Sequence, residues 1–277
     1  MQKQSLELLT QVQKIIDSYD FALTLRQIYY QLVARQIIPN EQRYYKKLSR
    51  LCVTGRDEGI LPEEGFADRL REVDKLSSWL DLNEFMQAVK RSYRKDKWQN
   101  QDSYLEIWTE KDALRSVLTE ITYQYDVALM VARGQLSRTE VYRTAGRYKT
   151  QNNKECHLYY CGDFDPSGLS IYGSIKKRIM DFGVFINFER IALTQKQIEK
   201  YQLPSDPAKQ SDPNYNKFVS IYGSDMVVEL DSLPPDVLRK IIEDCILRNI
   251  DPGPLAQIKR EERDEEVRLN KFIEKGI

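Results

Sequence analysis

The chain has 277 residues, of which 41% are hydrophobic and 30% charged, a composition typical of an ordinary globular protein with one large or two modest domains. Its 42 basic and 42 acidic residues cancel, so net charge does not indicate a nucleic-acid-binding protein and only local patterning can do so. The sequence has no apolar run of about eighteen residues and no signal-peptide pattern, so we expect a cytoplasmic protein without a membrane partner.

Residues 1–100 are predicted to form a helical domain and a connection to the second half of the chain. Residues 5–18 have an amphipathic pattern. A second helix is expected from Thr24, which with Gln27 has the form of a capping box, to Arg35. A third is expected from about Glu41 to Asp57, and the charged residues 66–100 are expected to be a mostly helical connection.

The third predicted helix carries one basic stripe. Its basic residues recur at helical spacing, and they are Arg43, Lys46, Lys47 and Arg50. Three short helices with a basic third one, followed by the Gly- and Pro-containing residues 59–65, are typical of a winged helix-turn-helix whose basic helix contacts DNA. The alternative is a solvated helix face with no partner.

Two acidic segments follow strand-like runs in the second half of the chain. Residues 104–109 are β-rich and lead to Glu110, and residues 157–161 lead to Asp163 and Asp165. Side chains two apart on an extended segment point the same way, so both aspartates face one side and Phe164 faces the other. Pro166 is suited to the first turn of a helix.

Residues 101–277 are predicted to be an α/β domain. Further strands are expected at 127–131, 184–193 and 226–230, a surface loop at 203–215 and a charged helix at 255–275. Strands alternating with helices indicate a parallel sheet, whose carboxyl edge is where ligands bind. Two neighbouring carboxylates there favour a hard divalent metal ion, although Asp163 and Asp165 could instead only cap the next helix.

Other metal chemistry is disfavoured by composition. His157 is the single histidine, and the four cysteines lack zinc-type spacing, so we expect neither a Cys/His metal site nor His-based catalysis. The sequence also has no Gly-x-x-x-x-Gly-Lys-Ser/Thr phosphate loop, so ATP would have to be used by a separate partner.

A glutamate closing one strand and an Asp-x-Asp closing a later one resemble the Toprim domain. The segment from Gly162 to Gly168 resembles the A subunit of type IIB topoisomerases and the related meiotic double-strand-break protein. The resemblance implies a winged-helix domain followed by a Toprim domain with a Rossmann-like, mainly parallel sheet. It also implies that Glu110, Asp163 and Asp165 are ligands of Mg²⁺.

The segment 25–30 resembles the Arg-x-x-Tyr-Tyr signature of the same family. In that signature the second tyrosine attacks the DNA backbone, which implies catalysis by Tyr30 and leaves Tyr29 to pack. Arg26 is four residues earlier, on the same helix face, where a cation would stabilise the phenolate. The bland alternative is that Tyr30 only packs. The segment 133–138 resembles a family loop only loosely, through Gly134 and a DNA-contacting Arg138.

These resemblances imply Mg²⁺-dependent cleavage of DNA through a phosphotyrosyl intermediate. Family A subunits are longer than this chain, and the tyrosine of one protomer works on metal held by the other, so a homodimer and a possible separate ATPase subunit are implied. The alternatives are a hydrolytic nuclease that uses metal-activated water, and a DNA-binding module without catalysis.

Overall fold

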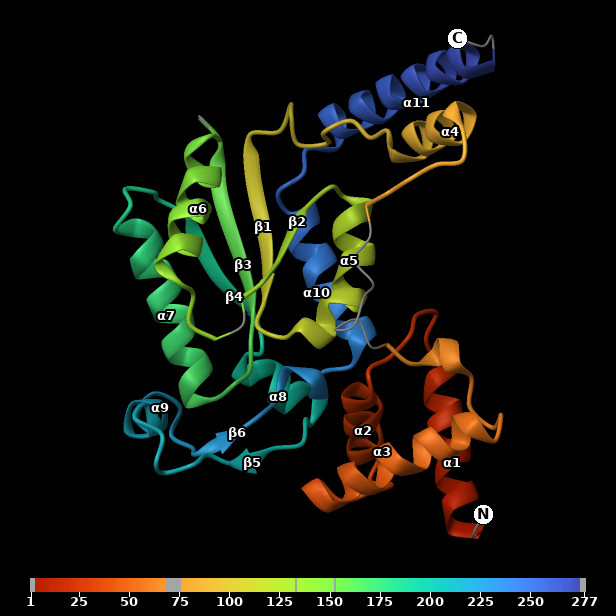
Figure 1. The fold of residues 1–277 in the computed structure, drawn as a ribbon. Helices are drawn as coiled ribbons and strands as arrows, with labels where there is room; N and C mark the ends of the chain where they lie inside the picture. Colours follow the sequence, from red (N-terminus) through yellow and green to blue (C-terminus); the bar gives the residue numbers. More distant parts are fainter. Residues whose placement is uncertain (1–2, 68–75, 133, 152, 275–277) are drawn as a thin grey trace.

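The computed structural model of the protein describes residues 3–67, 76–132, 134–151 and 153–274. The N-terminal part is helical, with α1 at Lys3–Ile16, α2 at Leu25–Ala34, α3 at Gln42–Asp57, a 3₁₀ turn η1 at Glu63–Gly65, and α4 at Leu82–Ser92 (Figure 1). Helices α1 to α3 enclose a hydrophobic core of their own, which includes Leu9, Ile28 and Leu48. The prediction of three helices in residues 1–57 is confirmed.

Local sequence explains where these helices begin. Thr24 and Gln27 form both bonds of the predicted capping box at the start of α2. The structure shows little of the β wing that a winged helix would have. Among residues 3–67 and 76–100, the β pairing consists of a single bridge between Leu23 and Phe66. Of the predicted helical connection at 66–100, residues 82–92 form helix α4 and residues 76–81 are not helical, while residues 68–75 lie outside the described residues. The Asp81 side chain accepts a hydrogen bond from Glu84 N and so caps α4.

The second part is an α/β unit around a four-stranded sheet. Strands β1 (Ser103–Thr109), β2 (Ala128–Val131), β3 (Glu155–Cys161) and β4 (Asn187–Ala192) are all parallel and are arranged in the order β2-β1-β3-β4. The prediction of a parallel α/β sheet is therefore confirmed. The remaining elements are η2 (Asp112–Leu114), α5 (Arg115–Gln124), α6 (Arg138–Lys149), α7 (Pro166–Met180), α8 (Gln195–Tyr201), β5 (Asp206–Pro207), α9 (Tyr215–Tyr222), β6 (Met226–Val227), η3 (Leu230–Ser232), α10 (Pro235–Leu247) and α11 (Pro252–Glu274).

Successive side chains along each strand point to opposite faces of the sheet, so that a hydrophobic core lies on each face. Ile107 and Tyr159 point to the face that α5 and α10 cover, whereas Trp108 and Tyr160 point to the face that α6 and α7 cover (Figure 1). Because β1 and β3 are buried on both faces, both read as nearly continuous apolar runs, as central parallel strands do.

Two predicted strands are shorter than expected. The strand expected at 184–193 is confined to Asn187–Ala192. The strand expected at 226–230 consists of only two residues, which pair antiparallel with β5 outside the main sheet. Val228 instead forms a two-bond bridge with Phe164, and Leu230 begins the turn η3. This bridge ties the 228–232 segment to the carboxyl end of β3.

The N-terminal helices lie at the carboxyl edge of the sheet, and α4 and α11 lie beside each other at the opposite end (Figure 1). Helix α2 packs against η3. Two further polar contacts join the parts, from Asn40 to Asp206 at 2.8 Å and from Arg239 to Asp20 at 3.2 Å. Within the described residues, no helix combines the length and the apolar character that crossing a membrane requires.

Candidate functional site

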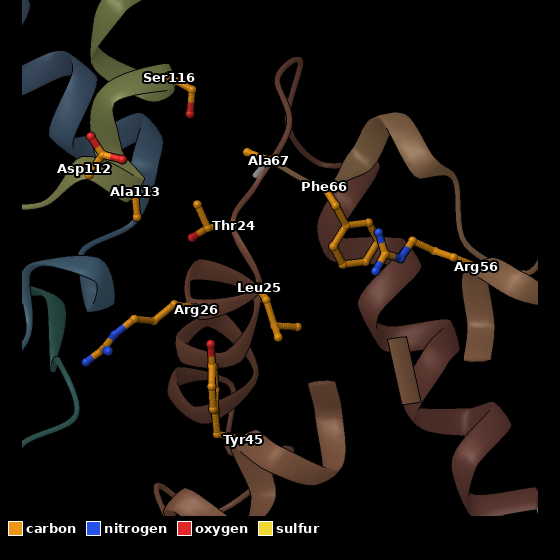
Figure 2. Close-up of a pocket in the computed structure, with 10 residues that line it drawn as sticks. All are labelled: Thr24, Leu25, Arg26, Tyr45, Arg56, Phe66, Ala67, Asp112, Ala113 and Ser116. Carbon is orange, nitrogen blue, oxygen red and sulfur yellow. The ribbon is translucent and has the colours of Figure 1, made fainter. Parts of the chain in front are cut away.

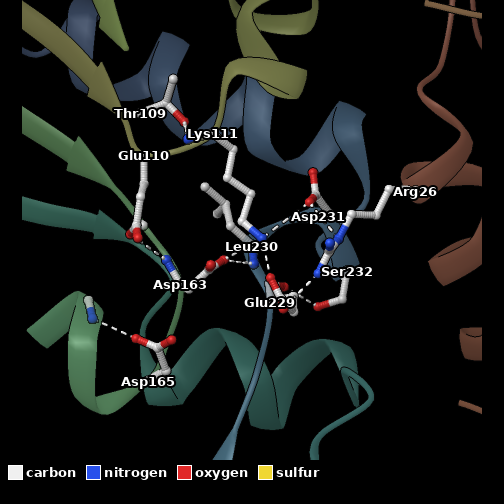
Figure 3. A network of polar contacts seen from close by, with 12 residues as sticks. Arg26, Thr109, Glu110, Lys111, Asp163, Asp165, Glu229, Leu230, Asp231 and Ser232 are labelled. Carbon is white, nitrogen blue, oxygen red and sulfur yellow. Dashed lines mark hydrogen bonds and ion pairs between the residues drawn. The ribbon is translucent and has the colours of Figure 1, made fainter. Parts of the chain in front are cut away.

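The carboxyl ends of β1 and β3 bring the predicted acids to one edge of the sheet. The two strands are neighbours with Thr109 opposite Cys161, so Glu110 and Asp163 leave the sheet side by side. The backbone amide of Asp163 donates to Glu110 Oε2 at 3.3 Å (Figure 3). The Tyr160 hydroxyl donates to the same oxygen at 3.1 Å. Sequence segments more than fifty positions apart thus meet as the strand pattern predicted.

Asp163 and Asp165 have different roles. Asp165 is the N-cap of α7, and its Oδ1 accepts a hydrogen bond from Gly168 N at 2.5 Å. Asp163 caps no helix, because its Oδ1 accepts from Leu230 N at 2.7 Å and contacts Lys111 Nζ at 2.9 Å. The capping alternative thus describes Asp165 alone. Gly168 is required there, since a Cβ would lie 2.5 Å from the carbonyl oxygen of Asp163.

Sequence reasoning did not single out three charged residues at this edge, namely Lys111, Glu229 and Asp231. The ammonium of Lys111 contacts Glu229 as well as Asp163, and it lies 3.2 Å from Asp231 Oδ2 (Figure 3). The clue in the sequence was that Glu229 and Asp231 sit where a predicted strand passes into a helix. We call Glu110, Asp163, Asp165, Glu229 and Asp231 together the acidic edge.

Helix α2 meets the acidic edge through Arg26. Its guanidinium lies 2.7 Å from Glu229 Oε1 and 3.3 Å from Asp231 Oδ2, and its Nη2 lies 3.5 Å from the Tyr30 hydroxyl. The predicted pairing of Arg26 with Tyr30 on one helix face is therefore present. Tyr29 packs edge to face on Tyr45, with ring centroids 5.3 Å apart.

Burial raises the pKa of Glu110, Asp163 and Asp165. The pKa of Glu110 is raised first by burial and then by the negative charge of Asp165. Burial likewise raises the pKa of Asp165. Burial raises the pKa of Asp163 to about 7 against the opposing effect of Lys111. For Glu229, the cations Lys111 and Arg26 more than offset burial, so its pKa is lowered.

Tyr30 is not an activated phenol in this conformation. Only 7% of the residue is exposed, and burial raises its pKa to about 12. Arg26 lowers the pKa of Tyr30, as expected for an adjacent cation, but by less than burial raises it. Attack by Tyr30 on a phosphate therefore needs its hydroxyl to become more accessible.

The donor chemistry of the acidic edge fits a hard divalent cation, although the three predicted ligands do not converge. Across the residues that the structure describes, no three Asp, Glu, His or Cys side chains stand close enough to hold a metal ion. Lys111 engages Asp163 and the start of α7 engages Asp165, which keeps the carboxylates apart. The charge of Asp165 raises the pKa of Glu110, which a cation beside them would relieve, and carboxylate oxygens are the ligands that Mg²⁺ prefers.

The predicted DNA-contacting residues lie elsewhere. The basic stripe of α3 faces solvent, and its buried face consists of Leu48, Cys52 and Gly55. Arg138 is exposed at the start of α6, where its guanidinium lies over the Phe182 ring at 5.4 Å. Gly134 has a positive φ of 59°, and Arg133 of the same predicted loop lies outside the described residues.

Two cavities flank Arg26 where the N-terminal helices meet the α/β unit. One, of about 430 Å³, is lined by residues of α2, α5 and the 66–67 segment, including Phe66 and Ser116 (Figure 2). The other, of about 400 Å³, is lined by Tyr29, Tyr30 and Tyr45 among others. Arg26, which pairs with Glu229, lines both cavities.

Comparison of the chain with protein-family models and with curated proteins gives no match.

Proposed function

We propose that this chain cleaves the DNA backbone in a divalent-metal-dependent reaction at the acidic edge, with Tyr30 as the nucleophile. The observation that carries the proposal is the position of α2, whose Arg26 pairs with Glu229 at 2.7 Å and with Tyr30 at 3.5 Å. Tyr30 and Arg26 are thereby linked through Glu229 and Lys111 to Asp163, whose backbone amide contacts Glu110. These residues come from distant parts of the sequence.

The metal ligands in this proposal are Glu110 and Asp165, with Asp163 as their neighbour. Burial raises the pKa of both Glu110 and Asp165, and the charge of Asp165 raises that of Glu110 further. Neither carboxylate has an ion-pair partner among the described residues, which supports the binding of a hard cation beside them. Bound Mg²⁺ would stabilise negative charge on the phosphate and the leaving oxygen. Asp163 positions Glu110 through its backbone amide.

The tyrosine reaction makes one bond and breaks one. The Tyr30 oxygen bonds to phosphorus and the phenolic proton passes to solvent. The bond from phosphorus to one sugar oxygen breaks, and that oxygen takes a proton from solvent to become a free hydroxyl. Arg26 holds the phenolic oxygen and, once freed from Glu229, can pair with a phosphate. The exposed basic stripe of α3 would contact the DNA backbone on either side, which fixes register without reading sequence.

A second candidate is hydrolysis by water at the same acidic edge, with Tyr30 as a packing residue. The observation that favours it is the burial of Tyr30, whose pKa of about 12 leaves almost no phenolate near neutral pH. The hydrolytic reaction needs the carboxylates but no tyrosine.

One assay separates these functions. The protein is incubated with DNA and Mg²⁺, and denatured samples are digested and searched for a tyrosine–nucleotide adduct, using wild type, Tyr30→Phe, Glu110→Gln and the matched control Tyr29→Phe. The proposal predicts an adduct in wild type and Tyr29→Phe only. Cleavage that survives Tyr30→Phe without an adduct supports hydrolysis. Salt-sensitive binding with no cleavage in any variant supports a non-catalytic DNA-binding module.

A further inference from the structure

The acidic edge divides into a compensated half and an uncompensated half. In the compensated half, Lys111 and Arg26 form ion pairs with three acids, namely Asp163, Glu229 and Asp231. In the other half, Glu110 and Asp165 accept hydrogen bonds from neutral donors, and within the described residues neither has an ion-pair partner. A divalent cation therefore gains more electrostatic energy beside Glu110 and Asp165.

Lys111 is held firmly in the compensated half. Its side chain is 14% exposed, and three carboxylates surround its single ammonium. Two of them, Asp163 and Asp231, lie 2.9 and 3.2 Å from the ammonium nitrogen. Lys111 has extended backbone angles, so Glu110 and Lys111 are directed to different sides as consecutive extended residues are. The end of β1 thus supplies an acid to one half and a cation to the other.

The buried charge of Asp231 is balanced by the cations Lys111 and Arg26. The residue is 1% exposed, and neither of its side-chain oxygens has a hydrogen-bond donor with good geometry among the described residues. Among the described residues, its charge is balanced by Lys111 at 3.2 Å and Arg26 at 3.3 Å alone. Without Lys111, a buried carboxylate would face one guanidinium that Glu229 already shares.

We propose that Lys111 is a resident cation that occupies the place of a second divalent ion. Enzymes that cleave phosphodiesters with two metal ions hold two cations close together, and here one of the two would be an ammonium built into the chain. Lys111 is then a positioning residue, because it fixes Asp163, whose amide in turn donates to Glu110. The inference rests on the proposed metal-dependent function, and it predicts one divalent ion per chain.

The test counts ions in metal-free protein by calorimetric titration with Mg²⁺ alone. Wild type and the charge-preserving control Lys111→Arg are expected to bind one Mg²⁺, at Glu110 and Asp165. Lys111→Met, which removes the charge but keeps the length, is expected to bind two. Adding Glu110→Gln to Lys111→Met is expected to lower the count to one.

A purely structural lysine would not change the count, so the stability of Lys111→Met gives a second readout. Without Mg²⁺ its Tm should fall by roughly 10 °C, because three carboxylates lose a partner, and saturating Mg²⁺ should restore about half of the loss. If Lys111→Met does not fold, the same measurements are made on Lys111→Gln. Binding of two Mg²⁺ ions by wild type would by itself overturn the inference.

The outcomes separate the inference from the proposed function. If wild type binds no Mg²⁺ and Lys111→Met binds one, Lys111 is a resident cation but the proposed metal site at Glu110 fails. If Lys111→Met binds no more Mg²⁺ than wild type and its Tm does not respond to Mg²⁺, the resident-cation inference is wrong.

Discussion

Replacing Asp163 by asparagine should stabilise the protein at high pH and not at low pH. Burial raises the pKa of Asp163 from 3.8 to about 7, so the folded protein prefers the protonated acid. An acid whose folded pKa is raised costs nothing below its unfolded pKa, and its cost grows as pH rises toward the folded value. The window is therefore about pH 4 to 7, above which the cost is constant.

The size of the effect is set by the shift in pKa. A difference of about three units at about 1.4 kcal/mol each corresponds to as much as about 4 kcal/mol. Because the ion pair with Lys111 already lowers the pKa of Asp163, this penalty is what remains after that pairing.

The assay is urea unfolding without divalent ions at a series of pH values between about 4 and 8. The free energy of unfolding of Asp163→Asn minus that of wild type should rise by a few kcal/mol over this range. Asp264→Asn, which changes an exposed carboxylate on α11, is the matched control and should show little pH dependence. A difference for Asp163→Asn that does not vary with pH would refute the claim that burial disfavours the ionised carboxylate.

Three further experiments test contacts of the site and of the fold that carries it. Gly168→Ala places a Cβ 2.5 Å from a backbone oxygen, so we expect a loss of about 1–3 kcal/mol in urea unfolding, and an unchanged stability would refute this close approach. A double-mutant cycle of Arg26→Met and Glu229→Gln should give a coupling of about 1 kcal/mol, since both side chains are partly exposed, whereas zero coupling would mean that α2 is not held by this pair. Glu106→Gln should cost about 2 kcal/mol, because the buried Glu106 carboxylate pairs with Arg147 at 2.9 Å and a neutral amide weakens that pair; thermal melts identical to wild type would contradict it.

Much of the fold was predictable because local rules and tertiary packing agree. The capping box at Thr24, the helix start at Pro166 and the buried runs of β1 and β3 all follow from residue type and spacing. The alternation of strands and helices was sufficient to predict a parallel sheet.

The short strand β6 was not predictable, for a physical reason. The segment 226–230 has strand-forming residues, but Val228 pairs with Phe164 at a turn rather than within the sheet. That pairing depends on a partner more than sixty positions away, and periodicity carries no information about it.

The site was predicted in part. Glu110 and Asp163 meet because parallel neighbouring strands end at the same edge, which a sequence pattern can indicate. The ion pairs of Lys111 and Arg26 depend on how the 229–231 turn and α2 pack against the end of the sheet. The spacing of residues along the sequence does not predict that packing. The burial of Tyr30, which raises rather than lowers its pKa, was equally outside the reach of the sequence.

The central claim is that the acidic edge binds a divalent cation through Glu110. Calorimetric titration of metal-free wild type and of Glu110→Gln with Mg²⁺ tests it directly. The account predicts saturable binding by wild type and an affinity at least about tenfold weaker in Glu110→Gln, since one anionic oxygen ligand is lost. Equal affinity in the two proteins, or no binding by wild type, would contradict it.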